Sequence, residues 1–196
     1  MKILVTGFDA FGGEELNPSQ LVLEKLSVAG ATVLPMVVPT QFDKGPALVL
    51  EALATYNPDW IVMLGQAGGR SQITVERVAI NLADAGAPDN AGFTPVDQTL
   101  VPEGPIAYFS GLPVKAMVRT IREAGVPAAV SNTAGTFVCN ALFYHVQHYL
   151  HINKLACRGG FLHIPLLPTQ SLDGTKPTMD LSVCCRGLEA ALGVLI

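Results

Sequence analysis

The chain has 196 residues, of which 49% are hydrophobic and only 14% are charged, and its formal net charge is −4. This composition excludes a disordered chain, and the small negative charge argues against a protein that binds nucleic acid through a basic surface. The length predicts one domain, over residues 1–196, with a sizeable buried core.

Short apolar runs that alternate with amphipathic stretches predict the elements in chain order. We expect strands over 2–6, 32–38, 60–64, 128–131 and 160–164, and a β-branched extended segment over 72–82. We expect helices over 18–29, 43–56 and 113–123, one beginning near Thr136, and a last one over 179–195. Residues 84–110 are rich in Gly, Pro, Asn and Asp, which predicts a long surface excursion.

This alternation predicts an α/β sandwich with a mostly parallel, twisted sheet, and the continuous apolar strands predict a sheet covered on both faces. In such sheets ligands bind at the carboxyl ends of the strands. Unusual segments follow four of the strands there: GFDAFGG, GQAGGR, NTAGTFVC and the strand end at His163. Their common position predicts a site at that edge.

The chain shows no sign of membrane insertion or export. The longest run without an acidic or basic residue, 124–153, is interrupted by Ser, Asn, Thr, Gln and three His, so we do not expect it to span a membrane. No signal peptide is apparent. The four cysteines lack metal-ligand spacing, and we expect reduced thiols in the cytoplasm.

Cys139 lies within the first turn of a helix if Thr136 is its N-cap. The positive potential of a helix N-terminus stabilises a thiolate, which predicts a lowered pKa for this thiol. The alternative is a small buried hydrophobic residue. Cys157, Cys184 and Cys185 lack such a context, and we interpret them as structural.

Four histidines offer a partner for that thiol. His163 ends an apolar strand on the same predicted edge as Cys139, so it is either a general base or a satisfied core residue. His145, His148 and His151 follow one another at a spacing of three on the Cys139 helix. That spacing spreads them around the helix and argues against a metal site.

Glu76 falls on a largely apolar face of the extended segment, where a carboxylate is costly unless it is paired. Its partner is either a cation such as Arg70 or Arg77, or an imidazole that it orients. The glycine loops contain neither GxGxxG nor a Walker lysine, so the nucleotide signal is weak. Phe8 and Phe11 instead offer walls for a flat, uncharged ring.

Together these segments resemble one family, pyroglutamyl peptidase I, also called pyrrolidone-carboxylate peptidase. The resemblance rests on five stretches in the family's order: TGFDAFGGEELNPS, GQAGGRSQITVERVAIN, APDNAGFTP, SNTAGTFVCNALFYHV and RGGFLHIPLLP. It implies a three-layer α/β/α sandwich, no cofactor and no metal. It also implies a cytoplasmic homotetramer. The charge and the interrupted apolar run argue against nucleic-acid and membrane partners.

The resemblance further implies a cysteine exopeptidase, an omega peptidase, that hydrolyses the bond after an N-terminal pyroglutamyl residue of peptides. Cys139 would be the nucleophile, His163 the general base and Glu76 the residue that orients the imidazole, with an acyl-enzyme intermediate. The family's substrate pocket matches a further six positions here: Phe8, Phe11, Asn17, Gln66, Phe137 and Val138.

The chain departs from the family pattern at the two residues before the PDN sequence at 88–90. Bacterial relatives often carry Arg and Ile there, and this chain has Gly86 and Ala87. We expect this departure to affect loop packing or substrate affinity rather than the reaction class. Two other functions stay open from the sequence: an enzyme similar to nucleoside phosphorylases, and a ligand-binding domain without catalysis.

Overall fold

The computed structural model describes all residues, 1–196, as one six-stranded sheet, one two-stranded sheet and five α-helices. The strands are β1 (Lys2–Phe8), β2 (Thr32–Val38), β3 (Trp60–Gln66), β4 (Ile73–Glu76), β5 (Val78–Ile80), β6 (Ala107–Phe109), β7 (Ala128–Ser131) and β8 (Arg158–Ile164). The helices are α1 (Pro18–Leu21), α2 (Lys44–Tyr56), α3 (Val114–Glu123), α4 (Val138–Ile152) and α5 (Leu181–Gly193), with a 3₁₀ turn at Pro168–Gln170.

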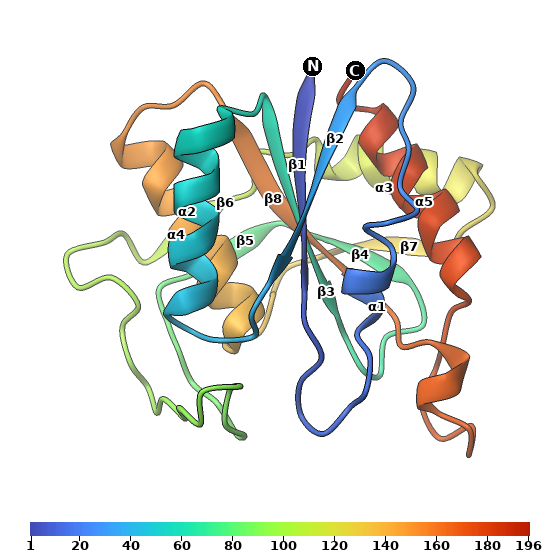
Figure 1. Ribbon diagram of the computed structural model, residues 1–196, viewed down its shortest axis with the longest axis horizontal. Helices are drawn as coiled ribbons and strands as arrows, with labels where there is room; N and C mark the ends of the chain where they lie inside the picture. Colours follow the sequence, from blue (N-terminus) through green and yellow to red (C-terminus); the bar gives the residue numbers. More distant parts are fainter.

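The large sheet has the strand order β2-β1-β3-β8-β4-β7. Strands β2, β1, β3 and β8 are parallel, whereas β4 runs antiparallel to β8 and parallel to β7. The sheet is strongly twisted, so β4 and β7 cross the view at a steep angle to β1 and β2 (Figure 1). The predicted mostly parallel α/β architecture is thus confirmed.

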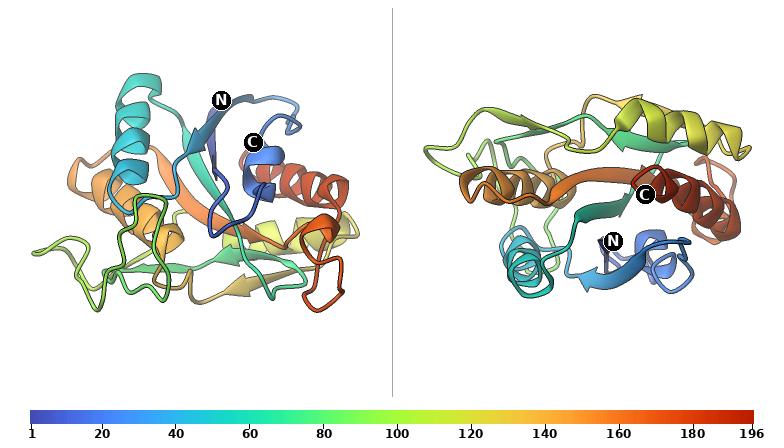
Figure 2. Two further views of the ribbon diagram at one scale, coloured as in Figure 1. Left: turned by 60° about the horizontal axis from the view of Figure 1, so that its bottom comes forward. Right: turned by 90° about the horizontal axis from the view of Figure 1, so that it is seen from above.

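Helices cover both faces of this sheet. Helices α2 and α4 lie on one face and α1, α3 and α5 on the other, as the two turned views also show (Figure 2). Each face has its own hydrophobic core. Strand β3 feeds both, because Val62 and Leu64 point to the α1/α3/α5 face and Ile61 and Met63 to the α2/α4 face. This alternation decides which face receives each polar residue of the site.

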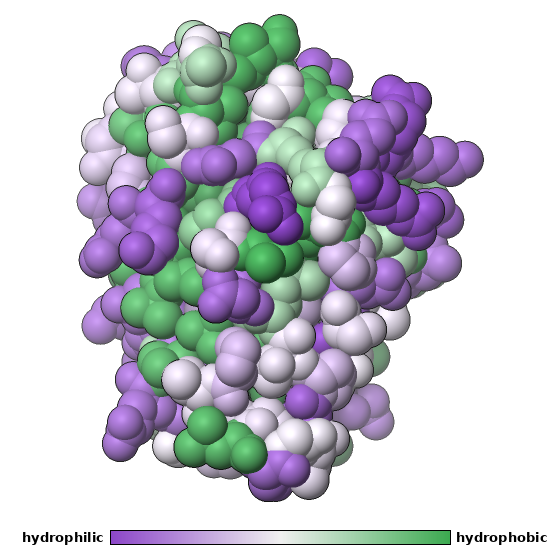
Figure 3. Space-filling model, turned by 90° about the vertical axis from the view of Figure 1, so that its right-hand side faces the viewer, coloured by the Kyte–Doolittle hydropathy of each residue, from purple (hydrophilic) through white to green (hydrophobic).

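The side of the molecule with α3 and α5 shows hydrophilic and hydrophobic residues interspersed rather than one continuous apolar surface (Figure 3). No helix combines the length and the apolar character that a crossing of the bilayer requires.

Three expectations about the elements need correction, and two of them concern the segment before α3. The extended segment 72–82 splits at Arg77. Its N–H donates to the carbonyl of Ser131, the last residue of β7, and its carbonyl accepts from the N–H of Ser110, which follows β6; both hydrogen bonds are 2.8 Å long. Residue 77 therefore connects two sheets. The excursion 84–110 also contains a strand, β6, which pairs with β5.

The third correction concerns the helix predicted over 18–29. It is regular only to Leu21, and the chain continues in turns in which Lys25 N and Leu26 N share one acceptor, Val22 O. Ser27 N then leaves the helical pattern altogether, because it donates to Glu189 Oε1 on α5 at 3.1 Å. A tertiary contact thus replaces the last helical turns.

Candidate active site

Strands β4 and β8 bring a carboxylate and an imidazole together on the α2/α4 face. The neighbouring residues Ile73 and Val75 join the opposite core, so Thr74 and Glu76 face α4. In the antiparallel register Thr74 lies opposite His163. His163 Nδ1 and Glu76 Oε1 are 2.8 Å apart, and both side chains are buried.

The Glu76 carboxylate is held almost entirely through one oxygen. Oε1 accepts hydrogen bonds from His163 Nδ1, from Arg70 Nη1 at 2.5 Å and from Thr74 Oγ1 at 3.3 Å, whereas the buried Oε2 has no partner. Although burial acts to raise the pKa of Glu76, the hydrogen bond and charge of His163, with smaller contributions from Ser131 and Arg70, hold it below its ordinary value. The carboxyl group is therefore ionised at neutral pH.

His163 has the protonation state that a base requires. Burial lowers the pKa of this imidazole, and the neighbouring Glu76 offsets that effect only in part. Because the ionised carboxylate can only accept, Nδ1 carries the proton of the neutral ring. Its Nε2 lone pair is therefore free to accept a proton.

Cys139 is the second residue of α4 and lies over β3 and β8 on the same face. A Cβ atom placed on Gly65 would stand 2.9 Å from Cys139 Sγ and equally close to the ring of Phe161. Gly65 pairs in register with His163. The absence of a side chain at Gly65 thus lets the half-buried thiol approach the sheet at the level of the imidazole.

The expected lowering of the thiol pKa is wrong for the resting chain. Burial raises the pKa of Cys139 to about 12, the charge of Glu76 adds to the rise, and Arg70 and the local backbone N–H oppose it. The helix N-terminus therefore does not outweigh desolvation. The resting chain therefore holds Cys139 as a neutral thiol and His163 as a neutral imidazole on the same face of the sheet.

The helix predicted to begin near Thr136 begins at Val138, with Phe137 as an N-cap that supplies no side-chain hydrogen bond. Thr136 is not the cap, because its hydroxyl donates to Asp84 O at 2.7 Å. Asn140 fixes the first turn instead: its side chain exchanges hydrogen bonds with the backbone of Ile80 and also donates to Leu82 O. The N–H groups of this turn remain available to an anion.

The four segments do not all lie on one carboxyl edge, as the sequence predicted. Since β7 runs with β4 and against β8, its end points away from the ends of β3 and β8. The loop 132–137 reaches the site by folding back, and Arg70 Nη2 donates to Thr133 O there at 3.1 Å. Cys139, His163 and Glu76 still lie on one face of the sheet, but through antiparallel pairing and a returning loop.

The predicted pocket aromatics cluster around the start of α4. The ring centroids of Phe11 and Phe137 are 5.9 Å apart. Those of Phe137 and Phe42 are 5.3 Å apart, with the two rings nearly perpendicular. Phe8 and Val138 are buried, and Phe8 packs on Phe161. An apolar wall thus adjoins the thiol, and the substrate contacts of these residues stay predictions.

The two polar pocket residues have partners within the protein. Asn17 is buried and caps α1, accepting from Ser19 N and donating to Asp9 O, so it fixes the loop that carries Phe11. Gln66 lies on the strand face opposite to Gly65 and accepts from Gln170 Nε2 at 3.1 Å. Their contact with a substrate stays a prediction, and their observed role is to shape the loops.

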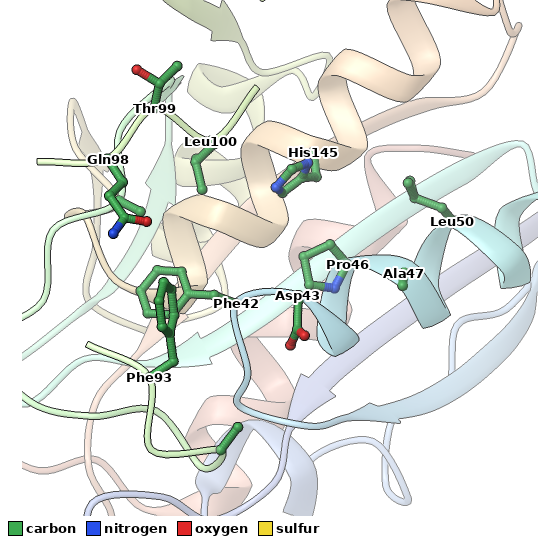
Figure 4. A pocket seen from close by; sticks show the side chains of 12 residues that line it. Phe42, Asp43, Pro46, Ala47, Leu50, Phe93, Gln98, Thr99, Leu100 and His145 are labelled. Carbon is green, nitrogen blue, oxygen red and sulfur yellow. The ribbon is translucent and has the colours of Figure 1, made fainter. Parts of the chain in front are cut away.

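A cavity of about 640 Å³ lies beside this site, between α2, α4 and the loop 91–100. Figure 4 shows the imidazole of His145 and the rings of Phe42 and Phe93 around it. Phe42 also contacts Phe137, so this ring separates the cavity from the start of α4. None of the residues singled out as catalytic or substrate-binding lines it.

The remaining cysteines and histidines lie apart from these residues. Cys157, Cys184 and Cys185 are buried free thiols. His148 Nδ1 hydrogen-bonds to the Tyr108 hydroxyl at 2.9 Å. No group of three His, Cys, Asp or Glu side chains is arranged to hold a metal ion.

Sequence reasoning missed three residues that build the site: Gly65, Asn140 and Thr133. A glycine inside an apolar strand signals a close approach, and that signal was present at Gly65. Nothing local marks the carbonyl of Thr133 or the side chain of Asn140 as part of the site, because the partners that tie them to it lie 58 or more residues away in the sequence.

Known proteins resemble the chain over its whole length. A family model described as pyroglutamyl peptidase matches residues 1–196. The pyrrolidone-carboxylate peptidase of Levilactobacillus brevis is 49% identical over 199 residues, covering 100% of this chain and 98% of that protein. One of Caldanaerobacter subterraneus is 48% identical with the same coverage.

Solved structures show the same architecture. The crystal structure of Bacillus amyloliquefaciens pyroglutamyl peptidase I has a TM-score of 0.95 and 47% identity, covering 98% of this chain and 95% of that one. A mutant pyrrolidone carboxyl peptidase of Pyrococcus furiosus has a TM-score of 0.95 at 36% identity, covering 99% and 97%.

Proposed function

The chain belongs to the pyroglutamyl peptidase family and is a cysteine peptidase that removes N-terminal pyroglutamate, and we propose that Cys139, His163 and Glu76 perform this reaction through an acyl-enzyme. One observation carries the proposal: the buried hydrogen bond between His163 and Glu76, with the thiol of Cys139 packed over the strand position opposite His163. A nucleophile, a base and an orienting carboxylate thus share one face of the sheet.

The first step transfers the thiol proton as the new bond forms. His163 Nε2 accepts the proton while Cys139 Sγ attacks the pyroglutamyl carbonyl carbon, giving a tetrahedral oxyanion. The imidazolium that results is stabilised by Glu76. Because both groups start neutral, proton transfer and attack are coupled, and no preformed thiolate is needed.

The backbone N–H of Cys139 in the first turn of α4 supplies a donor for the oxyanion. Collapse of the intermediate breaks the carbon–nitrogen bond, and the imidazolium gives its proton to the leaving amine. Water then attacks the thioester and loses a proton to His163. Collapse of this second tetrahedral intermediate breaks the carbon–sulfur bond, and the His163 imidazolium returns its proton to Cys139 Sγ as pyroglutamate leaves.

The apolar wall suits the chemistry of the substrate. A pyroglutamyl ring is a neutral lactam without a free α-amine, so its pocket needs hydrophobic contact rather than a carboxylate pair. Phe11 and Phe137 would provide stacking surfaces, with Phe8 and Val138 behind them. Asn17 would hold the Phe11 loop in place.

The proposal is tested with fluorogenic pyroglutamyl and prolyl substrates. Wild type should turn over only the pyroglutamyl compound, Cys139→Ala should be inactive, and Cys157→Ala should keep its activity because this buried thiol lies elsewhere. Circular dichroism checks that both variants fold. Full activity of Cys139→Ala would remove the nucleophile assignment, and equal turnover of the prolyl substrate would remove the specificity.

We also propose that the protein acts as a homotetramer in the cytoplasm. Free thiols are consistent with a reducing compartment. Ile106 and Phe109 beside and on β6 are 87% and 77% exposed, which supports a contact surface between copies. Light scattering of the purified protein measures the assembly, and a monomer at micromolar concentration would contradict it.

A further inference from the structure

Arg70 connects the proposed catalytic residues to the loop that leads to Cys139. It lies between β3 and β4, and its side chain is 27% exposed while Glu76 is fully buried. Nη1 donates to Glu76 Oε1 at 2.5 Å and to Thr74 Oγ1. Nη2 donates to Thr133 O at 3.1 Å. One guanidinium therefore joins the loop after β3, β4 and the loop after β7.

We propose that Arg70 is a positioning residue for the hydrolysis, one that fixes the Glu76 carboxylate and the Thr133 carbonyl together and balances the carboxylate charge beside His163. This inference rests on the proposed function of the same site. It adds a fourth residue that acts through the other three and does not touch the substrate.

Arg70 acts on the charge of the site through an oxygen that it shares with His163. Glu76 Oε1 binds both Arg70 Nη1 and His163 Nδ1, so the cation faces the same oxygen as the imidazole. Without Arg70, the buried carboxylate would act on His163 alone and would stabilise the imidazolium. Burial lowers the pKa of His163 first, and the charge of Arg70 lowers it further. Arg70 thus favours the neutral form that accepts a proton.

The groups that face the imidazole from each packed element agree with this reading. β4 contributes Glu76, the loop before β4 contributes Arg70, and α4 contributes the thiol of Cys139. The ring of Phe161, 4.8 Å from the imidazole centroid, is uncharged. Arg70 is the cation of this group, so its removal changes the charge balance in one direction.

Arg70 also holds the loop 132–137, which leads to Cys139, in place. Thr133 O accepts from both Arg70 Nη2 and Ser131 Oγ, and six residues later the chain reaches Cys139. Because the loop 132–137 folds back over the sheet, its path fixes where α4 begins. Loss of the guanidinium would free this carbonyl and loosen the placement of the thiol relative to the imidazole.

Arg77 provides a matched control. Its Nη1 donates to Asn132 Oδ1 at 2.8 Å, so it contacts the same loop from the end of β4. It makes no hydrogen bond to Glu76, Thr74 or His163. Arg77→Met therefore removes an arginine and a loop contact without changing the charge that faces the carboxylate.

The test compares wild type with Arg70→Met, Arg70→Lys and Arg77→Met in two assays across pH. One is kcat/KM for a fluorogenic pyroglutamyl substrate, and the other is the rate at which iodoacetamide alkylates Cys139. For Arg70→Met we expect kcat/KM to fall about 100-fold. We also expect the acidic midpoint of both profiles to rise by about one pH unit.

Arg70→Lys keeps the charge but cannot make the same set of contacts. Arg70→Lys should therefore retain the wild-type acidic midpoint and lose about 10-fold in kcat. If Arg70→Met does not fold, the comparison relies on Arg70→Lys. Arg77→Met should match wild type in both midpoints. An unchanged midpoint in Arg70→Met, full kcat in Arg70→Lys, or an equal shift in Arg77→Met would overturn the inference.

The two assays separate this inference from the proposed function. If wild type failed to hydrolyse the pyroglutamyl substrate, the proposed function would fall. The alkylation profiles would still show whether Arg70 sets the protonation of the imidazole beside Cys139.

Discussion

The two faces of the central sheet differ, although the same strands build both. On β4 and β8 the α1/α3/α5 face receives Ile73, Val75, Leu162 and Ile164, all of them core residues. The α2/α4 face receives Thr74, Glu76 and His163 one position along each strand. Strand alternation thus separates an apolar face from a face with buried polar groups.

The apolar face mainly contributes to stability, whereas the face with buried polar groups carries the candidate active site. A buried carboxylate is costly, and Glu76 is tolerated because His163, Arg70 and Thr74 all donate to it. The apolar face carries no such network and contributes hydrophobic burial instead. We therefore expect substitutions on the α2/α4 face to lower activity most, and substitutions on the opposite face to lower the free energy of unfolding.

The largest expected effect belongs to His163. His163→Ala removes the base and should lower kcat about 10⁶-fold, the scale for losing one member of a catalytic unit. Steady-state kinetics with a fluorogenic pyroglutamyl substrate measure it. Substantial activity in a folded His163→Ala protein would show that the imidazole is a satisfied core residue.

Glu76→Gln should have a smaller but still large effect, about 10⁴-fold in kcat, because the third member orients the base rather than accepting the proton. The amide also leaves Arg70 without its counter-charge, so we expect a lower melting temperature as well. Kinetics and thermal denaturation on the same preparation separate the two losses. Unchanged kcat with lowered stability would reduce Glu76 to a structural ion-pair partner.

Gly65→Ala should lower kcat/KM about 10- to 100-fold, because the new methyl group would lie 2.9 Å from Cys139 Sγ and displace the thiol. Gly68→Ala is the matched control in the next loop, where the added carbon meets its nearest neighbour at 3.8 Å. The control should retain wild-type kinetics. Equal kinetics for both variants would mean that the thiol does not need the space at Gly65.

The pH profile should show an acidic midpoint below 6.5, the ordinary pKa of histidine, because burial lowers the pKa of His163. Activity is present above that midpoint, where the imidazole is neutral, and is lost as pH falls through it. The pKa of about 12 for Cys139 also predicts no thiolate absorbance at neutral pH. A midpoint above 6.5 would contradict the neutral resting pair.

The smallest expected effect on activity comes from the residue beside His163. Leu162→Ala opens a cavity on the apolar face and should cost about 2–5 kcal/mol in the free energy of unfolding. Below the melting temperature kcat/KM should stay within a few-fold of wild type. Urea titration and kinetics measure the two quantities, and a large loss of kcat/KM would show that the faces are coupled.

The sequence predicts well the elements that depend on local pattern. The strand 32–38 matches β2, and the helix predicted over 43–56 forms as α2, with Asp43 as its N-cap. The split at Arg77 was not predictable, because it depends on two backbone hydrogen bonds to distant residues, one to Ser131 and one from Ser110. The same holds for Thr136, whose partner is the backbone of Asp84.

The residues of the candidate site could each be singled out from the sequence, but their arrangement could not. Cys139, His163 and Glu76 each stood out by residue type and context. Their meeting depends on the antiparallel pairing of β4 with β8, which a mostly parallel sheet does not predict. The protonation of the thiol depends on burial, which the position at a helix start did not reveal.

Trapping the acyl-enzyme is the most direct test of Cys139 as the nucleophile. Wild type is mixed with a pyroglutamyl ester, quenched in acid within the first turnover and measured by intact and peptide mass spectrometry. We expect a mass increase of one pyroglutamyl group, located on Cys139 and absent from Cys139→Ala. Turnover without any adduct on Cys139, or an adduct on another residue, would contradict it.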